Sequence, residues 1–237
     1  MTGLASIAEA ADYLIARPKP VLCLDTCDLL DIVEGFTDSK KGSLQAKAVR
    51  SMIERLEADP DRFQIVITYL VEREWGQNLE KIRNKASNFL RETDKRVAMI
   101  DDVLQHAAVD VGRPLLQYSD LPLVQSLVDM AEDLVGRSII LSQEGVCVDR
   151  ALARVIEQQR PSRNGNIKDS IHLEHYLELS KALGRSQFSE PRLFVSANKS
   201  DYWEGSPEPH PELRGGFDEA GLQFFGKLDA AVGVLRI

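Results

Sequence analysis

The sequence predicts an α/β protein in which helices cover both faces of a central, largely parallel sheet, a three-layer α/β/α arrangement. Three short apolar runs have the length and composition of buried strands, at residues 21–25, 63–68 and 192–196. Segments with helical periodicity separate these runs, and strands that alternate with helices favour a parallel sheet. Because 43% of the 237 residues are hydrophobic, we expect a packed core and a single domain over residues 1–237.

The first part of the chain alternates between helical periodicity and strand-like runs. The runs VLCLD and FQIVIT are continuous and aliphatic, which is typical of strands buried on both faces of a sheet. Pro18, Gly35 and the turn after Ala58 supply helix ends. The predicted elements are a helix over 4–16, a strand over 21–25, helices over 29–35 and 44–58, a strand over 63–68 and a long charged helix over 69–97.

The second part of the chain is predicted to be mostly helical. Residues 98–160 keep a helical apolar pattern that is interrupted at 112–114 and 121–122, so the region from about 81 to 160 forms an enlarged helical elaboration. A polar turn cluster at 161–166 follows. The remaining predicted elements are a helix over 167–183, a strand over 192–196, a loop over 204–216 and a last helix over 217–231.

Composition excludes several classes of protein. The formal charge of -8 disfavours a basic protein that coats nucleic acid, although a local basic rim around an acidic pocket stays compatible with it. No run approaches the roughly 18 apolar residues of a membrane span, and no secretion signal begins the sequence, so we expect a cytoplasmic protein without a membrane partner. Cys23, Cys27 and Cys147 lack CxxC spacing, and we expect them to be reduced packing residues.

Four acidic residues far apart in the chain stand beside the predicted strands. Asp25 closes the first strand, and Glu74 lies about two turns into the helix after the second. Asp169 lies in the first turn of its helix, and Asp201 lies in the loop after the third strand. Carboxylates that converge repel one another, so such a cluster favours a divalent cation, and oxygen ligands suit Mg²⁺ or Mn²⁺. Each acid alone also fits a structural role, as a helix cap or as a solvated surface charge.

Four segments, in this order, resemble the motif blocks of the PIN domain, and in particular its bacterial PIN-like branch. In that family an Asp followed by Thr or Ser closes the first strand, which matches Asp25 and Thr26. A Glu in the helix after the second strand matches Glu74, and the third acid opens a helix after a polar loop, as Asp169 does. The blocks fall near 21–36, 63–76, 163–180 and 192–203.

The fourth block follows the family pattern of a strand, a short polar motif and then an Asp with an aromatic residue. Ser196, Asn198, Asp201 and Tyr202 occupy those places. Asn198 stands where many members carry Asp, which is a departure from the pattern. The resemblance implies a PIN-like α/β/α fold and a metal-dependent endoribonuclease or phosphodiesterase, with single-stranded or structured RNA as substrate. It also implies partners such as an antitoxin or another protein, as in toxin–antitoxin pairs, and we consider a homo-oligomer as well.

The resemblance assigns a role to each candidate residue. We expect Asp25, Glu74, Asp169 and Asp201 to be catalytic. Asp25 and Asp201 would contact Mg²⁺ or Mn²⁺ directly, Glu74 and Asp169 would be further or water-mediated ligands, and Asn198 would offer a neutral oxygen. The expected substrate-binding residues, which orient water or phosphate or contact the nucleic-acid backbone, are Thr26, Ser196, Arg163, Lys168 and Lys199, with Arg160 beside them.

Two alternatives stay open from the sequence. A catalytically inactive PIN-like module that binds RNA or a protein is the first, and Asn198 is the residue that favours it. A different hydrolase of phosphate esters is the second, although Asp25 is not followed by the second Asp of an aspartyl-phosphate motif and no P-loop motif occurs. His172 and His175, three residues apart, are expected on the surface of an amphipathic helix.

Overall fold

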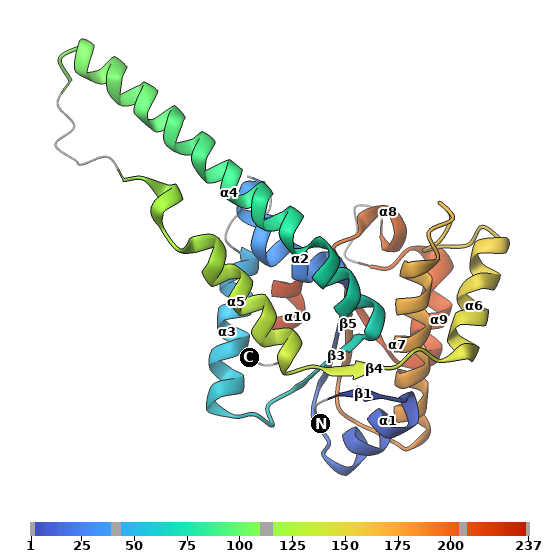
Figure 1. Ribbon diagram of the computed structural model, residues 1–237. Coiled ribbons are helices and arrows are strands. Elements are labelled where there is room, and N and C mark those ends of the chain that lie inside the picture. The colour runs from blue at the N-terminus through green and yellow to red at the C-terminus, as the bar shows by residue number, and fades with distance from the viewer. Residues whose placement is uncertain (1–2, 39–43, 110–115, 204–207, 236–237) are drawn as a thin grey trace.

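A computed structural model describes residues 3–38, 44–109, 116–203 and 208–235. Its centre is a six-stranded, all-parallel sheet with the order β1-β4-β3-β2-β5-β6. Helices pack on both faces of the sheet (Figure 1), so the predicted three-layer α/β/α fold is confirmed. The strands are β1 (Leu4–Ala5), β2 (Val21–Leu24), β3 (Gln64–Thr68), β4 (Ile139–Leu141), β5 (Arg192–Val195) and β6 (Gln223–Phe225).

The three strands that the apolar runs predicted form the middle of the sheet. β2 pairs with β3 through Leu22 and Ile65 and with β5 through Leu22 and Leu193. All residues of β2 and β3 are buried, as expected for strands covered on both faces. Since successive side chains of a strand point to opposite faces, Leu22 and Val21 belong to two different cores.

Helices divide between these two cores. One layer packs on the Leu22 side and consists of α2 (Thr26–Glu34), α3 (Leu44–Ala58), α4 (Tyr69–His106), α5 (Leu123–Gly136) and α10 (Leu228–Val234). The other layer packs on the Val21 side and consists of α1 (Ile7–Ala16), α6 (Gly145–Ile156), α7 (Ile167–Arg185), α8 (Lys199–Tyr202) and α9 (Pro211–Ala220). Two short 3₁₀ turns complete the described elements, η1 (Gly35–Thr37) and η2 (Tyr118–Asp120).

Helix starts at the carboxyl ends of the strands fix the position of the site. Asp25 directly follows β2, and Thr68 is the last residue of β3. Each of them is the N-cap of the next helix. Asn166 caps α7, and its side chain accepts a hydrogen bond from the Lys168 N–H. Because parallel strands end at one edge of the sheet, these helix starts face a common space.

Several element predictions were wrong. Residues 4–5 form β1 rather than the first turn of a helix, and Ile139–Leu141 form strand β4 inside the region predicted to be helical. The loop predicted over 204–216 includes the start of α9, and the helix predicted over 217–231 is split by β6. The missed strands have two or three residues each, too few for alternation or a sustained apolar run to distinguish them from helix or loop. The predicted break at 112–114 lies outside the described residues.

Helix α4 is the longest element, at 38 residues, or about 57 Å. Its first half packs on α2, and its second half projects away from the body, with η2 and the start of α5 beside it (Figure 1). The helical elaboration predicted near 81–160 therefore includes a projecting arm. Within the described residues, no helix combines the length and apolarity that a membrane crossing requires.

Candidate active site

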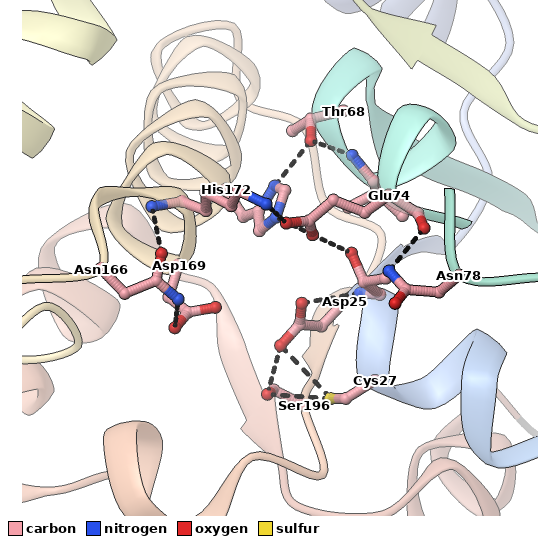
Figure 2. A network of polar contacts seen from close by, with 12 residues as sticks. Asp25, Cys27, Thr68, Glu74, Asn78, Asn166, Asp169, His172 and Ser196 are labelled. Atoms are coloured by element: carbon pink, nitrogen blue, oxygen red, sulfur yellow. Dashed lines mark hydrogen bonds and ion pairs between the residues drawn. The ribbon is translucent and has the colours of Figure 1, made fainter. Parts of the chain in front are cut away.

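Asp25 lies at the centre of the site, just after β2, and the residue is 3% exposed. Oδ1 accepts the Thr26 N–H at 2.7 Å, which is the capping bond of α2. Oδ2 accepts the Ser196 hydroxyl at 2.6 Å, and the Cys27 thiol lies 3.4 Å from the same oxygen (Figure 2). Asp25 is thus both a helix cap and a site carboxylate, so the two readings of its sequence position are compatible.

Glu74 projects from α4 toward the same space and is held by three donors. The Thr26 hydroxyl donates to it at 2.7 Å, and Lys168 Nζ forms an ion pair with Oε1 at 2.7 Å. His172 Nε2 lies 3.4 Å from Oε2. Burial alone would raise the pKa of Glu74, but the hydrogen bonds from His172, Lys168 and Thr26 outweigh it and lower this pKa to about 2. Glu74 is therefore a carboxylate whose negative charge is already neutralised.

His172 and His175 are both buried, so their prediction as surface residues was wrong. The reason is that α7 lies between other helices and the sheet and buries residues on all sides, which leaves no broad polar face. His172 Nδ1 contacts the Thr68 hydroxyl at 2.8 Å while Nε2 faces Glu74. His175 donates from Nδ1 to the Ile171 carbonyl and accepts the Glu144 N–H at Nε2, and burial lowers its pKa.

Asp169 lies in the first turn of α7 and faces the carboxylates from the other elements. The Asn166 side-chain amide donates to Oδ2 of Asp169 at 3.2 Å. Burial and then repulsion by Asp25 raise the pKa of Asp169 to about 7. His172 opposes this shift, and Asp201 and Glu74 add smaller repulsions. The four predicted acids therefore come close enough to influence the charge of one carboxyl group.

Asp201 and Asn198 form a local pair after β5. The Asn198 side-chain amide donates to Asp201 Oδ2 at 2.8 Å, and the Ser200 hydroxyl donates to the same oxygen at 3.1 Å. Asp201 is 7% exposed, in the first turn of α8. Asn198 lines the cleft with the other acids, whereas Asp201 is not among the described residues that line it. The role of Asp201 as a direct ligand therefore stays a prediction.

An open cleft of about 430 Å³ collects these groups at the carboxyl edge of the sheet. Asp25, Glu74 and Asp169 line it together with Thr26 and Asn198. Among the residues that the structure describes, no three acidic, histidine or cysteine side chains stand at the spacing of an assembled metal-binding group. The carboxylates thus share a cleft and an electrostatic environment without forming a closed ligand set.

The predicted basic residues lie in different places around this cleft. Lys168 pairs with Glu74, which lines the cleft. Arg163 pairs with Glu212, and the Lys199 ammonium lies 5.2 Å from the centre of the Trp203 ring. Arg160 is buried and donates to the Ser200 carbonyl, which holds the loop after β5. Lys168 is therefore the cation positioned to meet an anionic ligand beside the acids.

Sequence reasoning missed several residues of the cleft wall. Cys27, Asp31 and Glu34 line it from one face of α2, and Asn78 lines it from α4. The i, i+4 and i, i+7 spacing from Cys27 was the available signal, since a helix that directly follows Asp25 places these side chains on one side. Burial and the charges of Asp25 and Asp28 raise the pKa of the Cys27 thiol, which favours its protonated, less nucleophilic form.

A family model described as PIN domain matches residues 22–202, which is more than half of the chain. The chain therefore belongs to the PIN domain family, and the resemblance drawn from the four motif blocks is confirmed. Proteins of this family are usually nucleases and generally use divalent metals. Neither the curated proteins nor the solved structures contain a match to this chain.

Proposed function

We propose that the protein is a metal-dependent phosphodiesterase, and specifically an endoribonuclease of the PIN type. The observation that carries the proposal is that Asp25, Glu74 and Asp169, from three separate elements, line one cleft. Burial and repulsion by Asp25 raise the pKa of Asp169 there to about 7. Buried carboxylates that repel one another are stabilised by a nearby cation. The site lies at the carboxyl edge of a parallel sheet, where α/β proteins bind ligands.

The donor chemistry of the cleft fits a hard dication. Asp25 and Asp169 would hold it, with the Asn198 carbonyl oxygen and Asp201 as further donors, and these are all oxygen ligands suited to Mg²⁺ or Mn²⁺. Among the described residues, no Lys or Arg forms an ion pair with Asp25 or Asp169, whereas Glu74 already has Lys168. A bound dication supplies Lewis acidity that activates water and offsets charge on a phosphate.

The remaining side chains of the cleft position the acids and the substrate. Ser196 and Thr26 fix the Asp25 and Glu74 carboxylates through their hydroxyls, so their contribution is orientation. Lys168, which is half exposed at the side chain, is placed to exchange its contact with Glu74 for a phosphate oxygen of RNA. Arg163 and Lys199 would contact the RNA backbone farther from the cleft.

A catalytically inactive PIN-like module that binds RNA or a protein such as an antitoxin is the second candidate. The specific observation in its favour is that the acids of the described residues do not form a closed metal-binding group, while Lys168 occupies the neighbourhood of Glu74. Such a module would bind its partner without a dication.

The test is cleavage of a single-stranded RNA and of an RNA hairpin with Mn²⁺ or Mg²⁺, together with calorimetric titration of Mn²⁺. Asp25→Asn and Asp169→Asn should each reduce cleavage by about 100-fold or more and abolish Mn²⁺ binding. Asp218→Asn, an exposed Asp on α9, is the matched control and should change neither. Mn²⁺ binding that persists in both site variants would contradict the proposal, and RNA binding without metal binding or cleavage would favour the inactive module.

A further inference from the structure

A second pocket, of about 190 Å³, adjoins the acidic cleft. Asp31 lines both spaces, and Asn198 of the cleft stands in sequence between Ala197 and Lys199 of the pocket. This volume is below the roughly 300 Å³ at which pockets for drug-sized ligands begin, so it suits one small ring system. We call it the side pocket, and its wall includes Asp31, Gln45, Lys199, Trp203, Lys227 and Asp229.

Two buried polar atoms in the wall of the side pocket have no partner within the described part of the chain. Trp203 is 8% exposed, and its indole Nε1–H meets no hydrogen-bond acceptor there. Gln45 Oε1 is buried as well and meets no donor. Buried polar groups without a hydrogen bond are costly and rare in folded proteins. One unsatisfied donor and one unsatisfied acceptor in the same wall therefore point to a ligand that supplies the complement of both.

The indole of Trp203 is held so that the edge with its N–H group lies in the pocket wall. Lys199 Nζ lies over the ring, 5.2 Å from its centre. A Cβ atom on Gly226, which also lines the pocket, would lie 2.6 Å from indole Cε2 and 3.0 Å from Nε1. Only a residue without a side chain fits beside this edge. Trp203 is thus placed to recognise a ligand through its N–H group.

We propose that the side pocket binds an unpaired nucleobase of the RNA substrate, an inference that rests on the nuclease function proposed for the cleft. A nucleobase is planar and carries hydrogen-bond donors and acceptors on one edge, which is what Trp203 and Gln45 lack. Because the side pocket shares Asp31 with the cleft, it adjoins the place where the scissile phosphate would bind. Lys199 and Lys227 are exposed at its rim and would contact the RNA backbone.

The pocket wall favours a base that carries an exocyclic amino group. Besides Gln45 Oε1, the carboxylates of Asp31 and Asp229 line the pocket, so acceptors outnumber the buried donor of Trp203. Adenine, guanine and cytosine each have an amino group that donates, whereas uracil has carbonyl oxygens that would face these acceptors. A base paired in a duplex does not offer its edge in this way. The substrate class is therefore single-stranded RNA with a base other than uracil beside the cleaved bond.

Nuclear magnetic resonance of the indole N–H groups tests binding without metal and without cleavage. The chain has two tryptophans, Trp75 in the core and Trp203, so Trp203→Phe assigns the signal. With a chelator present, AMP and CMP should shift the Trp203 signal, and UMP should bind about 10-fold more weakly. Gln45→Leu should weaken AMP binding about 5-fold or more, whereas Gln105→Leu, at an exposed Gln of α4, should not. A Trp203 signal that no nucleotide shifts, or that UMP shifts as readily as AMP, would overturn the proposal.

Cleavage of short oligomers of adenylate, cytidylate and uridylate with Mn²⁺ tests whether the bound base belongs to the substrate. The KM should be lower for the adenylate and cytidylate oligomers than for uridylate, and Gln45→Leu should remove this difference. Equal KM values for all three oligomers, despite a response of Trp203 to AMP, would show that the pocket binds a free nucleotide and would overturn the proposal. Absence of both Mn²⁺ binding and cleavage would overturn the nuclease function itself, and the metal-free titration keeps the two failures apart.

Discussion

Lys168 Nζ lies 2.7 Å from Glu74 Oε1, so a cation expected to meet the substrate neutralises one of the acids expected to hold the metal. This ion pair lowers the negative charge of the cleft and contributes to the low pKa of Glu74, near 2. Burial alone would raise this pKa, but the hydrogen bonds from His172, Lys168 and Thr26 outweigh that effect. The pair gives the cleft a built-in counter-charge that a dication or a phosphate can replace.

Lys168→Gln should therefore separate metal binding from substrate binding. Loss of the cation leaves the negative charge of Glu74 without its counter-charge, so the Kd for Mn²⁺ measured by calorimetry should fall several-fold. The KM for RNA cleavage should rise, because a phosphate-binding cation is lost. Lys181→Gln is the matched control, because Lys181 lies on the same helix and pairs with Glu219 outside the cleft. Weaker Mn²⁺ binding in the Lys168 variant would contradict this account of the ion pair.

The raised pKa of Asp169 predicts how stability depends on pH in protein freed of metal by a chelator. Burial and the charge of Asp25 raise this pKa from 3.8 to about 7, so the folded state keeps a proton that the unfolded state releases above pH 4. The contribution of Asp169 to stability thus falls as pH rises from about 4 to about 7, and the loss is complete above that range.

Asp169→Asn should consequently be more stable than the wild type at pH 8, by at most about 4 kcal/mol, and the difference should shrink toward pH 4. Urea unfolding at both pH values with a chelator measures the effect, and Asp218→Asn should show none of it. Addition of Mn²⁺ should stabilise the wild type and not the variant. An equal stability of the two proteins at pH 8 would refute the repulsion inferred for the cleft.

Ser196→Ala should weaken the site without unfolding the protein. The Ser196 hydroxyl donates to Asp25 Oδ2, and removal of this bond leaves the carboxylate free to rotate about its capping contact with Thr26. Loss of such an orienting group typically costs about 10- to 100-fold in metal affinity or activity. Ser126→Ala, at an exposed serine of α5, is the control. A Mn²⁺ affinity and an RNA cleavage rate that both equal those of the wild type would contradict the role of Ser196.

The sequence predicted the centre of this fold better than its edges. β2, β3 and β5 have four or five residues in continuous apolar runs, and they form the middle of the sheet. β4 has three residues that also continue the apolar pattern of α5, and β1 and β6 have two and three residues. Such strands are defined by the neighbours with which they pair, so a local pattern does not reveal them.

The residues of the site were likewise predictable from the sequence only in part. Asp25 could be predicted because an acid directly after a buried strand lies at the edge where ligands bind. His172 could not, because its partner Glu74 is 98 positions away and nothing within α7 marks the residue as buried. The ion pair of Lys168 likewise depends on how α7 packs against α4, a relationship that only the folded chain contains.

Tyr176 joins the strand ends that carry the site, and Tyr176→Phe should destabilise them. Its hydroxyl donates to the Leu24 carbonyl at 2.6 Å and accepts the Thr68 N–H at 3.2 Å, and the ring is fully buried. Removal of the hydroxyl leaves two buried backbone groups without this partner, which should cost about 1 to 3 kcal/mol in the free energy of unfolding.

Urea unfolding in the presence of a chelator measures this cost for Tyr176→Phe without a contribution from bound metal. Tyr69→Phe is the control, since Tyr69 is 38% exposed and its loss of a hydroxyl should change stability by less than about 0.5 kcal/mol. Because Leu24 immediately precedes Asp25, the variant should also lower the affinity for Mn²⁺. A variant as stable as the wild type would show that the strand ends are held together without the Tyr176 hydroxyl.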